Sequence, residues 1–445
     1  MRIAWFTPLS AKTGIAKYSL SAALAISQLA EVDVWTTPRE DDYTINLPVR
    51  DLSDPNELKG LPGYDHIVYN LGNNPNMHAD IFDVYTRHPG VVILHDKTMA
   101  HFMRVYHTVL NSDPRRYADL LSYYCGADVG ARSYRQILGM EGQCGDVPLL
   151  EPCLWNATGA VVHSPDALPL VDRYPGLMPV TSIDLPFFLP DATSATSVDR
   201  VSLGVRPDDV LVISHGRIGE SKRIEQTIRS ISLLPAEARE HVQLVIAGGA
   251  HPAIVQNILS QARALGLTDR VRVTGFLPEA ELHAWLRAAD IFVNLRYPST
   301  ESGSGSLIEQ LEHPAPVVVS DIGFYASFPE DTLVRTPPAD EGQAIADALT
   351  PLILDKDLRC SIGARTHAYA ATRFDPATYA HRLVGFLEQV DLNRARLADV
   401  DSLGDGLLSI EPGRVSAEVS RRIDRFQVEE TRQETGERGA QSEMR

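Results

Sequence analysis

The sequence predicts a soluble α/β protein built from two doubly wound parallel-sheet domains. Short runs of apolar and β-branched residues alternate with amphipathic helical stretches, and the alternation restarts after a polar break near residue 195. The continuous apolar character of these runs is typical of parallel strands that are covered by helices on both faces. At 445 residues the chain is also long enough to form two domains of this kind.

The first half of the chain contains five runs that are predicted to be strands, at residues 3–7, 32–36, 67–69, 91–94 and 160–163. Helical patterns lie between several of them, for example at 15–29 and 99–109. Residues 191–200 are small, polar and poorly periodic, and we interpret them as a linker. The first domain is therefore predicted to comprise residues 1–190.

The second half repeats the pattern, with predicted strands at 210–214, 243–247, 272–274, 291–294 and 317–320. These strands and the helices after them define a second domain, residues 201–375, and two such domains enclose a ligand cleft. We expect residues 376–391 to form a helix that packs back toward the first domain. The charged tail, 392–445, is expected to be partly disordered.

The composition excludes several classes of function. The formal net charge of −17 argues against a nucleic-acid-binding protein, because such proteins usually carry a basic surface. The four cysteines have no metal-ligand spacing, and no apolar run approaches the roughly 18 residues that span a bilayer. We therefore expect reduced thiols, no metal site and a cytoplasmic protein.

Ligands of α/β sheets bind beyond the carboxyl ends of the strands, so the loops at those ends are the candidate sites. The loop after 210–214 contains Gly216, Arg217 and, five positions further on, Lys222 at the entrance to a helix. Two cations on one such loop can converge on a diphosphate. For this loop alone, a solvated charged turn is the alternative interpretation.

The loop after 291–294 is rich in glycine and serine and opens a helix. Ser304, Gly305 and Ser306 offer hydroxyl and backbone N–H donors to phosphate oxygens. Glu301 and Glu309 bracket this turn, eight positions apart. A carboxylate at the second position can accept both hydroxyl protons of a ribose, and one at the first can meet sugar hydroxyls. A capped surface helix is the alternative for the two glutamates alone.

Two further segments complete the pattern, Gly275-Phe276-Leu277-Pro278-Glu279 and Ala289-Asp290. Together with the two loops and in this order, they resemble the retaining glycosyltransferases of family 4, which have the GT-B fold. The resemblance covers most of residues 1–390. It implies the GT-B fold, in which two Rossmann-like domains face each other across a cleft.

The first domain resembles one branch of that family. Residues 13–19, Thr-Gly-Ile-Ala-Lys-Tyr-Ser, are similar to the SGIxxYS loop of a branch whose members often use GDP-mannose to build surface polysaccharides. The branch also has analogues of residues 69–73 and of the His95-Asp96 pair. Lys17 and the segment 312–314 depart from the family pattern, which leaves the sugar and the acceptor open.

The resemblance implies a role for each motif residue of the second domain. Arg217 and Lys222 would neutralise the donor diphosphate and its leaving group. Glu301 would contact the donor sugar near the reacting centre, and Glu309 would hold the ribose. Backbone or hydroxyl donors for the phosphates would come from Ser304, Gly305 and Ser306.

Further contacts are implied around these residues. Gly14 and Gly216 would let their loops pass close to the donor. Phe276 and Leu277 would line the nucleobase pocket. His95 would contact the donor sugar from the end of a strand in the first domain, with a purely structural histidine as the alternative.

The resemblance thus implies transfer of a hexose, with mannose and GDP-mannose favoured, to a glycan or lipid-linked acceptor in polysaccharide or glycoconjugate biosynthesis. No metal or other cofactor is expected, because Arg217, Lys222 and a helix terminus would take the place of a divalent ion. Lipid-linked acceptors are compatible with loose association at the inner face of the plasma membrane. The alternatives are a GT-B nucleotide-sugar epimerase and a non-catalytic sugar-nucleotide-binding protein. A Rossmann dehydrogenase is disfavoured, since its first loop needs a Gly-x-Gly-x-x-Gly turn and this chain has only Gly14 there.

Overall fold

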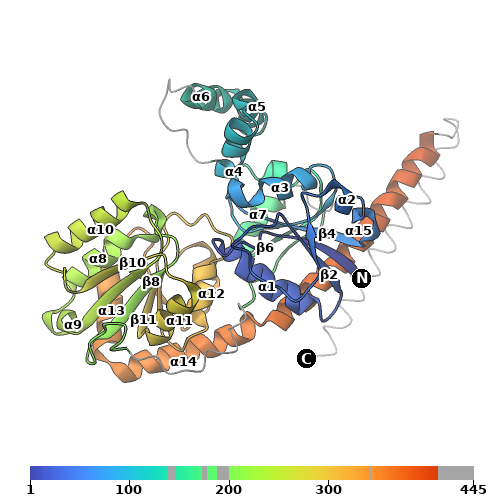
Figure 1. The fold of residues 1–445 in the computed structure, drawn as a ribbon. Coiled ribbons are helices and arrows are strands. Elements are labelled where there is room, and N and C mark those ends of the chain that lie inside the picture. Colours follow the sequence, from blue (N-terminus) through green and yellow to red (C-terminus); the bar gives the residue numbers. More distant parts are fainter. Residues whose placement is uncertain (138–146, 173–177, 188–199, 341, 409–445) are drawn as a thin grey trace, which may run out of the picture. The chain divides into compact units, whose positions relative to one another are not determined.

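The computed structural model describes residues 1–137, 147–172, 178–187, 200–340 and 342–408. Residues 1–388 form one compact unit, and a second unit begins at Gln389. The first unit contains two parallel sheets with their helices, which we call the N-terminal and C-terminal lobes (Figure 1). The predicted linker, 191–200, lies almost entirely outside the described residues, as does the predicted tail from residue 409 onward.

The N-terminal lobe contains a seven-stranded, wholly parallel sheet in the order β3-β2-β1-β4-β5-β6-β7. All five predicted strands are present. The two edge strands were not predicted, because three residues are too few to form a recognisable apolar run. The strands are β1 (Arg2–Phe6), β2 (Glu31–Thr36), β3 (Val49–Asp51), β4 (His66–Leu71), β5 (Gly90–Leu94), β6 (Ala157–Val162) and β7 (Val180–Ser182).

Several helices of this lobe begin at residues whose side chains cap the helix N-terminus. Thr13 caps the first helix by accepting a hydrogen bond from the Ile15 N–H at 3.3 Å, and Asn74 and Asp113 cap two others in the same way. Apolar residues of β1, β4 and β5 form the core beneath them. The helices are α1 (Gly14–Ile26), α2 (Pro55–Leu58), α3 (Pro75–Tyr85), α4 (Ala100–Val105), α5 (Pro114–Cys125), α6 (Ala127–Ile137) and α7 (Leu168–Val171).

The C-terminal lobe repeats the plan with a six-stranded parallel sheet in the order β10-β9-β8-β11-β12-β13. Its five predicted strands are present, and again only a three-residue edge strand, β13, was missed. The strands are β8 (Val210–His215), β9 (Val242–Ala247), β10 (Val271–Gly275), β11 (Ile291–Asn294), β12 (Val317–Ser320) and β13 (Val334–Thr336). The helices are α8 (Ile224–Leu233), α9 (Ala236–Glu240), α10 (Pro252–Ala264), α11 (Glu279–Ala288), α12 (Gly305–Leu311), α13 (Gln343–Leu354) and α14 (Lys356–Arg373).

The last helix, α15 (Pro376–Leu408), starts where it was predicted but continues well past residue 391. Near its start, the Tyr379 hydroxyl is hydrogen-bonded to the Tyr18 hydroxyl of α1. The Arg382 guanidinium donates to the Ser182 carbonyl oxygen of β7 at 2.6 Å. The first turns of α15 therefore contact the N-terminal lobe. No helix within the described ranges is long and apolar enough to cross a bilayer.

The strand orders identify where a ligand should bind. In each sheet the order reverses beside the first strand, between β1 and β4 in the N-terminal lobe and between β8 and β11 in the C-terminal lobe. Ligands of open α/β sheets bind at the carboxyl ends of the strands that flank such a switch point. The segments that follow β8 and β11, including the first turns of α12, contain most of the residues selected from the sequence.

Candidate active site

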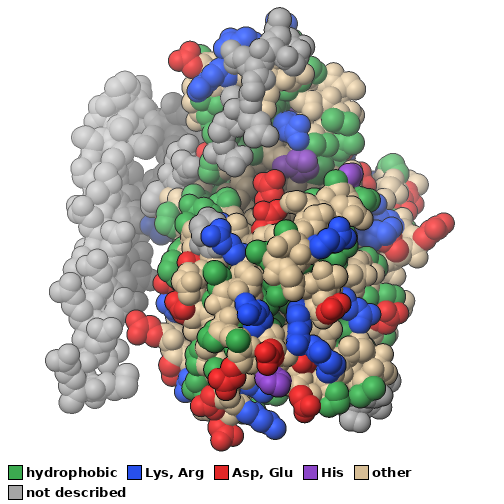
Figure 2. All heavy atoms as spheres, turned by 90° about the vertical axis from the view of Figure 1, so that its left-hand side faces the viewer, with side chains coloured by type: hydrophobic (Ala, Val, Ile, Leu, Met, Phe, Trp, Pro, Cys, Tyr) green, Lys and Arg blue, Asp and Glu red, His purple; other side chains and the backbone are tan. Residues whose placement is uncertain are grey.

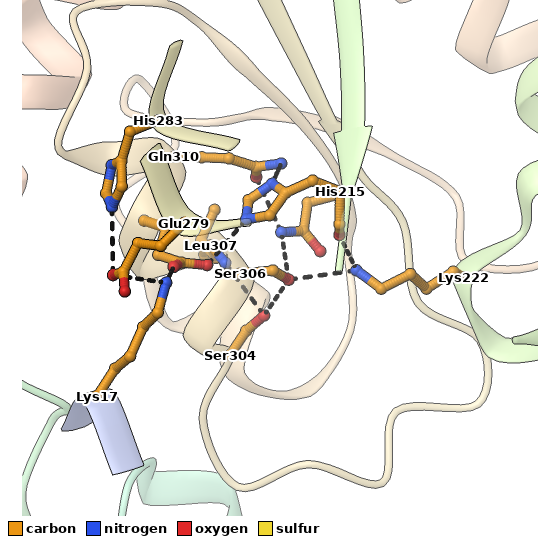
Figure 3. Close-up of polar contacts among 11 residues, drawn as sticks. Lys17, His215, Lys222, Glu279, His283, Ser304, Ser306, Leu307 and Gln310 are labelled. Atoms are coloured by element: carbon orange, nitrogen blue, oxygen red, sulfur yellow. Dashed lines mark hydrogen bonds and ion pairs between the residues drawn. The ribbon is translucent and has the colours of Figure 1, made fainter. Parts of the chain in front are cut away.

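Lys222 is held at the β8–β11 switch point by the loop that follows β8. Its ammonium lies 2.5 Å from the His215 carbonyl oxygen and 3.3 Å from the Ser306 hydroxyl (Figure 3). Gly216 has a φ of +99°, and a Cβ there would lie 3.1 Å from the Lys222 ammonium. The positive φ therefore favours glycine at this position, and any side chain there would press against the Lys222 ammonium.

The surroundings of Lys222 disfavour its charge. The side chain is buried, and burial together with the nearby Arg296 guanidinium lowers the Lys222 pKa well below its usual value. The two recorded acceptors of the ammonium are neutral oxygens. An anion bound beside Lys222 would compensate this desolvated charge, so the position suits a phosphate group.

The turn that opens α12 supplies hydroxyl and backbone donors on the other side of Lys222. The Ser304 hydroxyl caps the helix by accepting a hydrogen bond from the Leu307 N–H at 3.3 Å. The Ser306 hydroxyl accepts from the Asn294 side chain at 3.1 Å as well as from Lys222. Gly305 lies between the two serines. Lys222, Ser304, Gly305 and Ser306, which were all predicted to contact the phosphates, therefore lie close together.

Glu309 lies on α12 and has partners on both of its oxygens. His215 donates to one oxygen from Nε2 at 3.0 Å, and Lys17 of α1 donates to the other at 2.6 Å. Because Gln310 donates to His215 Nδ1 at 3.2 Å, His215 is the neutral tautomer with its proton on Nε2. Burial raises the Glu309 pKa, but the His215 hydrogen bond and the Lys17 charge outweigh it and lower the pKa to about 2. Glu309 is therefore a fixed anion.

Glu301 is oriented by a second set of partners. The Arg296 guanidinium contacts its two carboxylate oxygens at 3.0 and 3.3 Å, and the Tyr325 hydroxyl donates at 2.5 Å. Burial opposes ionisation, but Arg296 outweighs it and keeps the Glu301 pKa below its usual value. Asp96 of the N-terminal lobe pairs with Glu301 through a backbone bridge, and burial raises the Asp96 pKa to about 6.

His95 links the two lobes at the end of β5. Its ring nitrogens lie 3.2 Å from the Asn70 side-chain oxygen and 3.1 Å from His163 Nε2. Its carbonyl oxygen accepts from the Ser302 N–H at 2.9 Å, while the Ser302 hydroxyl accepts from the His163 N–H at 2.6 Å. The loop that contains Glu301 is therefore anchored on the N-terminal lobe.

Other predicted site residues lie at the edge of this cluster. Arg217 is exposed. Burial lowers the pKa of His101 on α4, and the positive charges of Arg104 and Arg217 lower it further. Phe276 is 70% exposed, and Leu277 is partly buried. A Cβ on Gly14 would meet no atom within 4 Å, so open space lies beside the start of α1. Contact of these residues with a donor stays a prediction.

The sequence predicted that the protein has no metal site and does not bind nucleic acid, and these two predictions concern its titratable side chains and its surface. Among the described residues, no group of three or more His, Cys, Asp and Glu side chains could hold a metal ion. Cys153 and Cys360 are free thiols, and Cys144 lies outside the described residues. On the face drawn in Figure 2, basic and acidic side chains are interspersed among the described residues, unlike a basic nucleic-acid-binding stripe.

Residues 196–368 match the family described as glycosyl transferases group 1. This part of the chain is a group 1 glycosyltransferase domain. A D-inositol 3-phosphate glycosyltransferase of Xylanimonas cellulosilytica is 30% identical over 200 residues, which are 43% of this chain and 46% of that protein. Serotype-specific mannosyltransferase WbdA of Escherichia coli is 31% identical over 113 residues, which are 25% of this chain and 14% of WbdA. The chain spans less than half the length of these curated relatives.

The similarity of fold extends beyond the group 1 domain. HepE of Anabaena, solved in complex with UDP-glucose, has 16% identity and a TM-score of 0.60 over 87% of this chain and 100% of its own. Sucrose-phosphate synthase of Thermosynechococcus elongatus has 18% identity and a TM-score of 0.58 over 88% and 99%. At such identities the likeness concerns the fold alone. The predicted GT-B fold is confirmed.

The group 1 domain contains site residues that the sequence did not single out. Arg296 and Tyr325 orient Glu301, and His215 orients Glu309. His215 is the last residue of β8 and Arg296 lies two positions after the end of β11, so their places at strand ends were an available signal. Tyr325 lies in a short turn after β12, and no feature of the sequence singled it out. Lys17 was noticed only as a departure from the family pattern.

Proposed function

We propose that this chain is a retaining glycosyltransferase that moves a hexose from a nucleotide-diphosphate sugar to a glycan or lipid-linked acceptor. The observation that carries the proposal is the convergence of Lys222, Ser306 and Glu309 at the β8–β11 switch point. A desolvated cation beside hydroxyl and backbone donors suits a diphosphate. A buried, ionised carboxylate a few residues away suits the two hydroxyls of a ribose.

The proposed reaction breaks the bond between the donor's anomeric carbon and the diphosphate oxygen. The acceptor hydroxyl oxygen forms the new bond to that carbon, and its proton passes to the departing phosphate oxygen. Negative charge grows on the leaving diphosphate in the transition state. Preorganised donors aimed at such a charge are usually the largest contribution to catalysis, and Lys222, Ser306 and the exposed Arg217 would supply them here.

The sugar would be held from both lobes. Glu301 is kept ionised by Arg296 and Tyr325, so it can accept hydrogen bonds from sugar hydroxyls. His95 lies on the strand end to which the Glu301 loop is bonded. Retention of the anomeric configuration follows from attack on the leaving-group face, which is the chemistry that the family resemblance implies.

Mannose is the proposed sugar and GDP-mannose the proposed donor. Two observations support this choice, the similarity of residues 13–19 to a branch that often uses GDP-mannose and the local similarity to the mannosyltransferase WbdA. The nucleobase would lie against Phe276 and Leu277. Polysaccharide or glycoconjugate biosynthesis at the inner face of the plasma membrane is the corresponding setting.

A panel of nucleotide sugars tests the proposal directly. Thermal stability is measured with GDP-, UDP-, ADP- and dTDP-sugars, since a ligand at about 100 times its Kd stabilises the fold by about 2.7 kcal/mol. We expect GDP-mannose to give the largest shift and to release GDP only when a glycan acceptor is added. An α-linked product seen by NMR supports retention. An isomerised donor with no transfer product would instead identify an epimerase, and binding without turnover a non-catalytic protein.

A further inference from the structure

Lys17 joins the two lobes through two carboxylates. From the first turns of α1, its ammonium lies 3.2 Å from Glu279 Oε1 on α11 (Figure 3). The same ammonium lies 2.6 Å from Glu309 Oε1. The Lys17 side chain is only 15% exposed, and that of Glu309 only 11%. The contact is therefore shielded from water, and an ion pair of this kind is stronger than one at the surface.

The same carboxylate is the proposed partner of the donor ribose. Its Oε2 accepts from His215 at 3.0 Å, so Lys17 occupies the side of the carboxylate that the C-terminal lobe leaves available. Two ribose hydroxyls need acceptor positions on that side. The ion pair and a fully bonded ribose therefore compete for Glu309.

We propose that Lys17 is a specificity-determining residue, an inference that rests on the function proposed above. Lys17 competes with the ribose hydroxyls for Glu309, and it moves to Glu279 when the donor binds. In the absence of donor it holds the carboxylate in place. In its presence, Lys17 reduces the net contribution of the ribose to affinity.

Glu279 is suited to receive the displaced ammonium. It already lies within contact distance of Lys17, and it is fixed by the Tyr43 hydroxyl at 2.9 Å and by His283 at 3.5 Å (Figure 3). The His283 and Lys17 contacts outweigh burial and lower the Glu279 pKa to about 2, so it is an anion at neutral pH. The shift needs a side-chain rotation but no movement of α1 or α11.

The titratable groups around Lys17 are consistent with a charge that persists through the exchange. Burial disfavours the charged form of Lys17, but the negative charges of Glu309 and Glu279 outweigh this effect and hold the Lys17 pKa above its usual value. Tyr43 faces the pair from the N-terminal lobe, and burial raises its pKa. Lys17 therefore keeps its proton whichever carboxylate it contacts.

The test compares a ribonucleotide with its 2′-deoxy analogue, GDP and 2′-deoxy-GDP for the proposed donor. Calorimetry gives the ratio of the two Kd values, in which the contributions of the phosphate contacts cancel. We expect Lys17→Gln to increase the preference for GDP about tenfold, because the hydroxyls no longer displace a cation. Glu279→Gln should decrease the preference, since Lys17 then has only Glu309. The double variant should behave like Lys17→Gln.

Lys12→Gln is the matched control, because it makes the same substitution at an exposed lysine of the same lobe that pairs with Asp41 at 3.3 Å rather than with Glu279 or Glu309. Its preference for GDP should equal that of the native chain. An unchanged ratio in Lys17→Gln, or an equal weakening of both nucleotides, would overturn the inference while leaving the proposed function intact. Loss of the preference in Glu309→Gln supports the ribose contact. Absence of nucleotide binding by the native chain would overturn the proposed function and this inference with it.

Discussion

Replacing Lys222 by methionine removes the buried charge that the proposed diphosphate would meet. Two unit charges about 4 Å apart attract by about 4 kcal/mol at an effective dielectric constant near 20. Removal of one oriented donor from a developing oxyanion costs about 2.7 to 4 kcal/mol in other enzymes. Both figures correspond to a loss of roughly 100- to 1,000-fold in kcat/KM. The unliganded fold should keep its stability, because the ammonium is desolvated there and faces neutral oxygens.

The assay measures release of nucleoside diphosphate in the presence of acceptor, with Lys356→Met as the control for an exposed lysine of the same domain. We expect the control to retain native kinetics. Thermal unfolding of both variants should agree with the native chain to within about 1 kcal/mol. A Lys222→Met enzyme with near-native kcat/KM would refute the assignment of Lys222 to the phosphates.

The protonation of Lys222 gives the same assignment a second readout. Burial and Arg296 lower its pKa in the free protein, and a bound diphosphate favours the ammonium, so binding raises the pKa again. Nucleotide binding at a pH above the Lys222 pKa of the free protein must therefore take up a proton, and the affinity must fall as pH rises. Calorimetry in buffers of different ionisation enthalpy measures this uptake, and Lys222→Met should abolish it.

Three further outcomes follow from the site. Glu309→Ala should raise the donor KM more than it lowers kcat, because a ribose contact acts on the ground state and the transition state alike; steady-state kinetics with an unchanged KM would contradict this role. Gly303→Ala should cost about 1 to 3 kcal/mol in chemical unfolding, because its Cβ would lie 2.8 Å from the His163 Cβ and 2.9 Å from Leu185. Native stability would show that the Glu301 loop can leave the N-terminal lobe freely. Glu309, with a pKa of about 2 against about 4.3 in an unfolded chain, stabilises the fold above that higher value, and the contribution disappears as pH falls toward 2. The unfolding free energy of Glu309→Gln should consequently change less over this range than that of the native chain.

The strands could be predicted because burial on both faces leaves a continuous apolar run. Segments such as β5 and β12 are buried at every residue, and their composition is almost wholly apolar. Edge strands such as β3 are partly exposed and only three residues long, so they have no such signal. The end of α15 was also missed, since a long helix that continues in a charged sequence has no apolar boundary at residue 391.

The residues of the candidate site also fall into those that the sequence predicted and those that it did not. Lys222, Ser304 and Ser306 were selected because residues after strands of a parallel sheet meet at one edge, and this rule depends on chain order alone. Of the partners that orient Glu301, Arg296 lies five positions earlier on the same loop, whereas Tyr325 lies 24 positions later, beyond β12. Nothing in the sequence predicts that the Tyr325 hydroxyl reaches the Glu301 carboxylate.

The sequence by itself determined the two parallel sheets and the loops in which a diphosphate would bind, because these depend on the order and periodicity of apolar runs. Only the tertiary structure decided how the charges in those loops are paired. Lys17 is a departure from a motif when seen in the chain, and its partners Glu279 and Glu309 are more than 250 positions away. Pairing across such a separation depends on how the two lobes pack, and with the packing come the desolvation of Lys222 and the competition for Glu309.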